Sequence, residues 1–438
     1  MLKKIMVICL SLSVMGGPAL GGEEERVLSL KEAVEMALER SAVIHSAREG
    51  MKGADYLRKA TMADFFPTLR TEYDYTRLDE DPFIRLEPLR TKRTVGTQDN
   101  YSWTTVVDQP LFRGGALYWS YRLAKLGVDL TKVSLELVKQ DLILQVKAAY
   151  FTILKAEKIR QVAVQAVQQL ESQLKVSRAF YEVGIIPKND LLQTQVQMAQ
   201  ARQNLTSAEV ELAIGKASFN TLLRRDVGME VKVEDILEYR PMEVPFEESL
   251  EKARKNRPEL KETELTVKKA EKEVQLARSE YFPTVSLIFN YERVGDDPGV
   301  SGSEFEDKDS WNIMASAGWT FWQWGKKRQL VREKETRLIQ AKDARVQVED
   351  SISLEVKGAY LRLREARDKI GVAEVAIEQA EENFRMNQER FKEQVATSTD
   401  VLDAQTLLTQ ARTNYFNALS DYRIAWARLD RAMGIVTY

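Results

Sequence analysis

Two rows of residues recur every seven positions between residues 325 and 395. The first row is large and apolar (Val356, Leu363, Ile370, Ile377, Phe384 and Phe391), and the second consists of alanines (Ala359, Ala366, Ala373 and Ala380). A seven-residue repeat is typical of supercoiled helices. The stretch contains no proline, so it predicts one helix of about 70 residues and about 100 Å. Two adjacent rows favour a ring of helices, although a long antiparallel coiled coil without a pore remains open on this stretch alone.

Four other segments alternate between apolar and polar residues, which is typical of half-buried β-strands. They form two predicted hairpins, 67–112 and 283–322, with strands of about 10 residues, the length that a tilted transmembrane strand needs. Aromatic residues gather at both ends of the strands: Phe65, Phe66, Phe112, Phe282, Trp322 and Trp324 at one level, and Tyr101, Trp103 and Trp311 at the other. Such aromatic belts mark the two faces of a bilayer. The alternative is a soluble β-domain with an aromatic core.

The second half of the chain repeats the first at a spacing of about 210 residues. Phe66-Pro67-Thr68 returns as Phe282-Pro283-Thr284, and the segment 146–150 returns at 356–360. A common spacing indicates one duplicated unit. The expected organisation is a first repeat at 22–224 (helix, hairpin 67–112, long helix 113–184, helix 188–223), an equatorial linker at 225–245 and a second repeat at 246–438 (helix, hairpin 283–322, long helix 325–395, helix 398–434).

Within this scheme, one helix is expected from residue 30 to about 64, and the polar segment 77–100 is expected to be a loop. The helices before each hairpin and after each turn together match the long helix in length, so they can stack end to end beside it, with an irregular belt at 225–245. Four strands cannot close a barrel, and open edges cannot face lipid, so the chain must oligomerise. Two copies would give a filled barrel of eight strands; a conducting pore favours three copies with twelve.

Composition and charge narrow the function. The N-terminal residues 1–21 combine Lys3 and Lys4 with a short apolar run and small residues, which predicts a signal peptide and an exported chain. The formal charge is −2, so bulk charge does not suggest nucleic acid as a partner. Cys9 and His45 are the only cysteine and histidine, which argues against a metal site, a thiol nucleophile or a histidine base. We expect no cofactor and no enzymatic activity.

The chain resembles the TolC-like outer membrane efflux proteins from about residue 28 to residue 435. The resemblance is carried by Thr399-Asp400-Val401-Leu402-Asp403-Ala404-Gln405, by the paired Phe-Pro-Thr entries, by Leu111-Phe112-Arg113-Gly114-Gly115 and by the duplication. It implies a mainly α fold with a small transmembrane β-barrel. In that family three copies build a twelve-stranded barrel in the outer membrane and an α-helical tunnel through the periplasm. The implied function is a passive exit duct for efflux or type I secretion, docked on a periplasmic adaptor and, through it, on an inner-membrane pump.

The resemblance also implies functional residues at the two helical turns. Asp400 and Asp403 match an acidic ring at the periplasmic gate, and Asp190 matches the corresponding residue of the first repeat. The expected adaptor-docking tips are Gly184, Pro187, Lys188 and Asn189 in the first turn, and Val395, Thr397 and Ser398 in the second. Helix capping is the alternative role for these aspartates. Capping is the preferred interpretation for Asp190, whereas the gate role is preferred for the pair Asp400 and Asp403.

Two positions depart from the family pattern. Where some members carry an arginine and a tyrosine that lock the closed tip, this chain has Ala396 and Phe391, so closure is expected to rest on packing. The alternative function is an exported, soluble coiled-coil scaffold or periplasmic adaptor without a pore.

Overall fold

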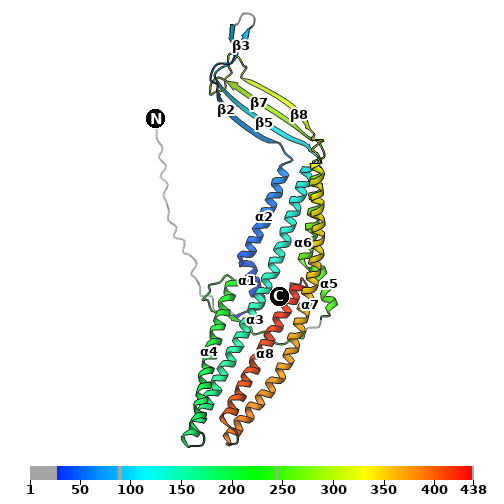
Figure 1. Cartoon of the computed structure of the whole chain (residues 1–438). Helices are drawn as coiled ribbons and strands as arrows, with labels where there is room; N and C mark the ends of the chain where they lie inside the picture. Colours follow the sequence, from blue (N-terminus) through cyan, green and yellow to red (C-terminus); the bar gives the residue numbers. More distant parts are fainter. Residues whose placement is uncertain (1–26, 87–90, 242–243, 437–438) are drawn as a thin grey trace, which may run out of the picture.

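The computed structural model describes residues 27–86, 91–241 and 244–436. In chain order, the elements are β1 (Val27–Leu28), α1 (Leu30–Arg40), α2 (Ala42–Ala63), β2 (Thr68–Arg77), β3 (Phe83–Leu86), β4 (Thr91–Thr94), β5 (Asp99–Arg113), α3 (Ala116–Glu182), α4 (Lys188–Leu222), β6 (Lys232–Val233), α5 (Phe246–Asn256), α6 (Pro258–Ser279), β7 (Thr284–Gly295), β8 (Asp309–Gly318), α7 (Lys326–Lys392) and α8 (Ser398–Ala432). The expected signal peptide, 1–21, lies outside the described residues. Figure 1 shows an elongated molecule with a sheet at one end and two helical turns at the other.

The helices repeat in length as well as in order. Each half of the chain contributes helices of 11, 22, 67 and 35 residues. α3 packs against α4 and α7 against α8, and α3 also packs along α8. The two helical hairpins therefore meet through α3 and α8, with α4 and α7 on the outer sides (Figure 1). The predicted mainly helical fold with a duplicated unit is confirmed.

The four long strands form one antiparallel sheet in the order β2-β5-β7-β8. Its register places Tyr73 opposite Trp103, Trp103 opposite Arg293, and Arg293 opposite Asp309. Since paired residues share a face and neighbours alternate, one face is largely apolar (Leu69, Tyr73, Tyr75, Trp103, Val107, Phe289, Tyr291, Trp311 and Ile313), and the other is polar (Arg70, Glu72, Thr104, Asn290, Glu292 and Asn312). Within the described chain, the edge strands β2 and β8 each pair on one side only.

A glycine makes the passage from the sheet into α3 possible. Gly114 has φ +60°, and a Cβ at this position would lie 2.2 Å from the carbonyl oxygen of Ser279. Only glycine fits such a left-handed position against a neighbouring backbone. α3 consequently begins at Ala116, three residues later than the expected start of the long helix.

Two sequence predictions about the strands were wrong. The segment 77–100, expected to be a loop, contains the hairpin β3–β4. Its strands are only four residues long, too short for a clear alternation, and the Lys92 ammonium lies 3.9 Å from the centre of the Phe83 ring, a cross-strand contact that the sequence pattern does not reveal. At the other hairpin, β8 ends at Gly318 rather than near residue 322.

The helices before each hairpin, each expected to be continuous, are broken. Ser41 has extended backbone angles between α1 and α2, and its hydroxyl accepts the backbone N–H of Val43 at 3.2 Å, which caps α2. In the second repeat Arg257 is extended between α5 and α6, because the following Pro258 disfavours a helical residue before it. Among the described residues, no helix combines the length and the apolar character needed to cross a membrane.

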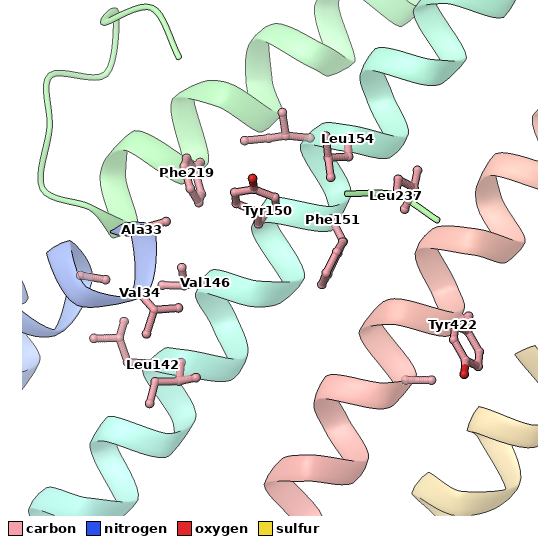
Figure 2. Packing of buried hydrophobic residues seen from close by; sticks show 14 of the residues in the cluster. Ala33, Val34, Leu142, Val146, Tyr150, Phe151, Leu154, Phe219, Leu237 and Tyr422 are labelled. Atoms are coloured by element: carbon pink, nitrogen blue, oxygen red, sulfur yellow. The ribbon is translucent and has the colours of Figure 1, made fainter. Parts of the chain in front are cut away.

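The largest core lies around the middle of α3, where α1, α4, α8 and the belt residues 225–245 converge (Figure 2). The fully buried Tyr150 hydroxyl lies 3.0 Å from the carbonyl oxygen of Leu28 and 2.9 Å from that of Glu234. In the described part of the belt, β6 pairs in parallel with β1, so the expectation of a purely irregular belt was wrong. Two residues per strand carry too little pattern to be recognised in a sequence. Burial raises the pKa of Tyr150, which therefore stays a neutral hydrogen-bond donor.

Candidate functional site

The end of the molecule opposite the sheet contains the residues predicted to act at the gate and the docking tips. The first turn closes α3 with a Schellman motif. The Gly184 N–H donates to the Tyr181 carbonyl at 3.0 Å, and the Ile185 N–H donates to the Phe180 carbonyl at 2.8 Å. Gly184 has φ +78°, the left-handed conformation that favours glycine at this position. Pro187 occupies the N-cap position of α4 without a side-chain capping hydrogen bond, and α4 begins at Lys188.

The second turn has the same geometry without a glycine. Gln394 N–H donates to the Phe391 carbonyl at 3.0 Å, and Val395 N–H donates to the Arg390 carbonyl at 2.9 Å. Gln394 has φ +62°, which is strained for a residue with a Cβ. The second tip therefore reproduces the first at a spacing of 210 residues, with backbone strain stored at Gln394.

Asp400 forms a capping box with Thr397 at the start of α8. The Thr397 backbone N–H and hydroxyl donate to Oδ2 of Asp400 at 2.8 and 2.7 Å, and the Asp400 N–H donates to Oγ1 of Thr397 at 3.2 Å. The backbone N–H of Thr397, followed by its hydroxyl, holds the pKa of Asp400 below its usual range. Asp400 therefore caps the helix and keeps an exposed negative charge at the tip.

The other two aspartates have simpler surroundings. Asp403 is exposed one turn after Asp400, so the two carboxylates lie on the same side of α8. Asp190 is half-buried in the first turn of α4, and its backbone N–H donates to the Pro187 carbonyl at 3.2 Å. The arrangement can supply two exposed carboxylates per chain at the tip of α8. Their role as a gate remains a prediction.

A buried polar contact joins the two helical hairpins near the tip. The hydroxyls of Thr194 and Ser398 lie 3.1 Å apart, and neither side chain is exposed. The Phe180 and Phe391 rings pack beside them with centroids 5.4 Å apart, and Phe391 is 2% exposed. Ser398, expected at the docking surface, therefore faces α4 instead. Its burial depends on a neighbouring helix that the local sequence does not identify.

Apolar side chains are exposed on both turns. Val183 is 70%, Ile185 43% and Val395 63% exposed. Only Val395 was among the residues predicted for docking. The exposure of Val183 and Ile185 could have been predicted from the sequence. They flank the turn glycine Gly184, where the chain leaves the helix and an apolar side chain no longer packs against a neighbouring helix. In the described ranges, no group of three or more histidine, cysteine or acidic side chains could hold a metal ion.

Comparison with known proteins identifies the family. The profile of the family described as "Outer membrane efflux protein" matches residues 33–223 and 249–435. The outer membrane efflux protein BepC of Brucella suis is 21% identical over 97% of this chain and 89% of its own length. The alkaline protease secretion protein AprF of Pseudomonas aeruginosa is 23% identical over 94% of this chain and 86% of its own.

The fold is shared with solved channels of similar length. The outer membrane channel CmeC of Campylobacter jejuni superposes with a TM-score of 0.80 over 92% of this chain and 85% of that chain, at 15% sequence identity. The family predicted from the sequence is confirmed, and an outer membrane location and a role as an efflux channel follow from it. The alternative of a soluble scaffold is not favoured. With the family profile matching most of its length, this chain belongs to the outer membrane efflux protein family.

Proposed function

We propose that this protein is the passive exit duct of a tripartite efflux or type I secretion system. In this proposal three copies form a twelve-stranded barrel and a helical tunnel, and the two turns dock on a periplasmic adaptor that connects to an inner-membrane pump. Two relatives support both kinds of system, since one is named an efflux protein and the other an alkaline protease secretion protein.

The observation that carries the proposal is the sheet, which has two open edges and one apolar face. β2 and β8 are free to pair with other strands, and exposed edges of this kind favour pairing with another chain. If β8 of one copy pairs with β2 of the next, the contact is heterologous, and three copies related by a three-fold axis close it into a ring. The apolar face can then contact lipid, while the polar face lines the channel.

The helices show a matching pair of unpartnered surfaces. α4 exposes an apolar row (Leu192, Val196, Val210 and Ile214), and α7 exposes another (Ile339, Val346, Leu354, Leu361, Val372 and Val375), each side chain between 47 and 75% exposed. These rows lie on the outer helices of the chain, on the same two sides as β2 and β8. Contact between α4 of one copy and α7 of the next would continue the barrel contact along the tunnel.

The decisive experiment measures the number of copies and the conductance together. Protein extracted from outer membranes with detergent should have the protein mass of three chains by light scattering after size exclusion, and it should form ion-conducting pores in planar bilayers. A chain that is recovered from the cell as a monomer without detergent, or a trimer that never conducts, would contradict the proposal.

The acidic gate is tested by neutralising both exposed carboxylates. Three copies would bring six carboxylates from Asp400 and Asp403 around one axis, which attracts cations. The double variant Asp400→Asn and Asp403→Asn should weaken block of the pore by divalent and trivalent cations. Asp421→Asn, an exposed change farther along the same helix, is the control. Unchanged block in the double variant would show that the gate lies elsewhere.

Docking is tested at the exposed tip residues. Lys188→Glu and Val395→Asp should each reduce recovery of the adaptor in pull-downs while the trimer remains as stable as wild type, because both side chains are exposed. Arg254→Glu, an exposed change in α5, is the matched control for altered charge. Equal recovery of the adaptor by all variants would argue against docking through the tips.

A further inference from the structure

A small cavity lies between the middle of α3 and the C-terminal half of α8. Its volume is about 220 Å³, and its lining includes Lys147, Phe151, Arg240, Arg423, Trp426 and Asp430. A water molecule occupies about 30 Å³ of liquid, so the cavity is several water molecules in size. Three of these six side chains are cationic and one is anionic. The cavity is therefore electropositive and large enough for a small anion.

Two of the three cations are balanced by carboxylates. Lys147 is buried, and its Nζ lies 3.8 Å from Oδ2 of Asp430, which is buried as well. Arg240 is exposed, and its Nε donates to Oε1 of Glu238 at 2.7 Å. These two pairs contribute no net charge. The charge that remains belongs to Arg423.

Arg423 is half-buried and, among the residues that the structure describes, forms no ion pair with a carboxylate. Burial, followed by repulsion from Arg240, lowers the pKa of Arg423. Its guanidinium is only partly removed from water, and no nitrogen of Arg423 is among the fully buried side-chain atoms without a hydrogen-bond partner. The planar fork of N–H donors is therefore open to a ligand, and its shape matches the oxygens of phosphate or carboxylate. The missing acceptor and the positive cavity point to the same kind of ligand.

Aromatic side chains hold this guanidinium in place. Its central carbon lies 4.9 Å from the centre of the Phe151 ring and 5.5 Å from that of Trp426. Phe151 projects from α3 toward the side of α8 (Figure 2). Cation–π contacts occupy the face of a guanidinium and leave the N–H groups at its edge available. The arginine is thereby ordered before any anion arrives, which lowers the entropic cost of binding.

The cavity also lies away from the surfaces proposed to join the copies. It is bounded by α3 and α8, the helices through which the two hairpins of one chain meet, whereas assembly would use α4 and α7.

We propose that the cavity at Arg423 binds a phosphate-type oxyanion, either as a free ion or as the headgroup of a lipid. Arg423 supplies both the charge-assisted hydrogen bonds and the net positive charge of the cavity. The inference goes beyond the proposed export function and does not depend on it, because binding is measured on purified protein without a pump, an adaptor or a transported substrate.

Isothermal titration of the detergent-solubilised full chain tests the proposal. Inorganic phosphate should bind saturably at an ionic strength matched with sodium chloride, and Arg423→Gln should weaken the binding by about 10-fold or more, as expected for loss of a charge-assisted hydrogen bond. Arg428→Gln removes an exposed arginine five residues farther along α8 and should bind as wild type. Arg423→Lys keeps the charge but loses the fork, and should bind with intermediate affinity.

A parallel titration with short-chain phosphatidic acid separates the two sources of phosphate. Tighter binding of the lipid would assign the site to a headgroup, and tighter binding of inorganic phosphate would assign it to the free ion. If the wild-type protein binds neither probe saturably, the proposal is overturned. It is equally overturned if Arg423→Gln, folded by circular dichroism, binds as tightly as wild type. Should that variant fail to fold, wild-type affinity in a folded Arg423→Lys variant would overturn the role of the fork.

Discussion

Replacing Arg257 with methionine should destabilise the contact between the end of α8 and the start of α6, here called the join. The loss in the free energy of unfolding should be larger than for a substitution of an exposed residue nearby. The Arg257 side chain is only 5% exposed. Its Nη1 and Nη2 donate to the two carboxylate oxygens of Glu355 at 3.1 and 2.7 Å, and Nη1 also lies 3.1 Å from the Arg431 carbonyl oxygen. Nε forms an ion pair with Glu259 at 2.9 Å. One arginine therefore connects α6 and α7 with the last carbonyls of α8.

The expected loss follows from what the substitution leaves behind. Breaking a buried ion pair by removing one partner costs about 3–5 kcal/mol. Glu355 is 48% exposed and can regain water, and Glu259 keeps its ion pair with Arg431 at 2.8 Å. The rehydration of Glu355 and the remaining ion pair of Glu259 both lower the cost of breaking the Arg257 ion pairs. We therefore expect a loss of roughly 2–4 kcal/mol in the free energy of unfolding. Methionine keeps most of the side-chain volume, which limits any contribution from a cavity.

Chemical denaturation of the detergent-solubilised protein, followed by circular dichroism, measures this loss. Arg254→Met provides the control, since Arg254 is exposed on the preceding helix and its replacement should change stability by less than about 0.5 kcal/mol. Hydrogen exchange should locate the loss at the end of α8 and the start of α6. If Arg257→Met unfolds at the same denaturant concentration as wild type with an unchanged slope, Arg257 does not stabilise the join.

Three further predictions concern the turns and the core. Gln394→Gly should leave the free energy of unfolding unchanged or raise it by up to about 1 kcal/mol, because glycine adopts the left-handed conformation without strain. Gly184→Gln should lower it by about 1 kcal/mol for the opposite reason. Thermal melts that reverse this order would contradict the idea that backbone strain is stored at Gln394. Tyr150→Phe should cost about 1–2 kcal/mol by leaving the Glu234 carbonyl without its donor, because the Leu28 carbonyl still accepts the Glu234 N–H at 3.1 Å. Tyr360→Phe, at the equivalent position of the second repeat, should cost less in the same melts. The Asp400 cap should be fully present above its unfolded pKa of about 4 and be lost as the pH falls through its lower folded pKa. The protection factors of the first-turn amides of α8, which are corrected for the intrinsic pH dependence of exchange, should therefore fall only in that acidic range; a fall in protection near neutral pH would refute the cap.

Much of the fold follows from patterns that repeat over many residues. The long alternation in 284–294 and the heptads of 325–395 each contain enough positions to specify an element and its buried face. The breaks at Ser41 and Arg257 were missed for different reasons. Nothing in the sequence near Ser41 interrupts the helical pattern, so the break between α1 and α2 was visible only in the structure. The break between α5 and α6 could have been predicted, because Pro258 follows Arg257. The pairing of β1 with β6 depends on a contact across some 200 residues.

The candidate site shows the same division between local and distant causes. The capping box is local, since Thr397 and Asp400 have the spacing that the motif requires. Helix capping was recognised as the alternative role of Asp400, but Thr397 was not recognised as its partner. Whether a tip residue is exposed depends on packing between the hairpins. Ser398 is buried because Thr194 of α4 lies against it, and no feature of the sequence around either residue specifies that contact. The cavity at Arg423 likewise requires α3, α8 and the belt to come together.

The equal helix lengths of the two repeats constrain how the molecule can change in size. Below the belt α3 runs beside α4, and α7 beside α8, with both turns ending at the same level (Figure 1). One additional heptad would lengthen a helix by about 10 Å, so an insertion in the lower half of α3 would need matching insertions in α4, α7 and α8 to keep the two turns level. The distance from the belt to the tip is therefore fixed jointly by four helices. A lineage adapting this protein to a deeper or shallower compartment would have to gain or lose residues in whole heptads at all four places at once.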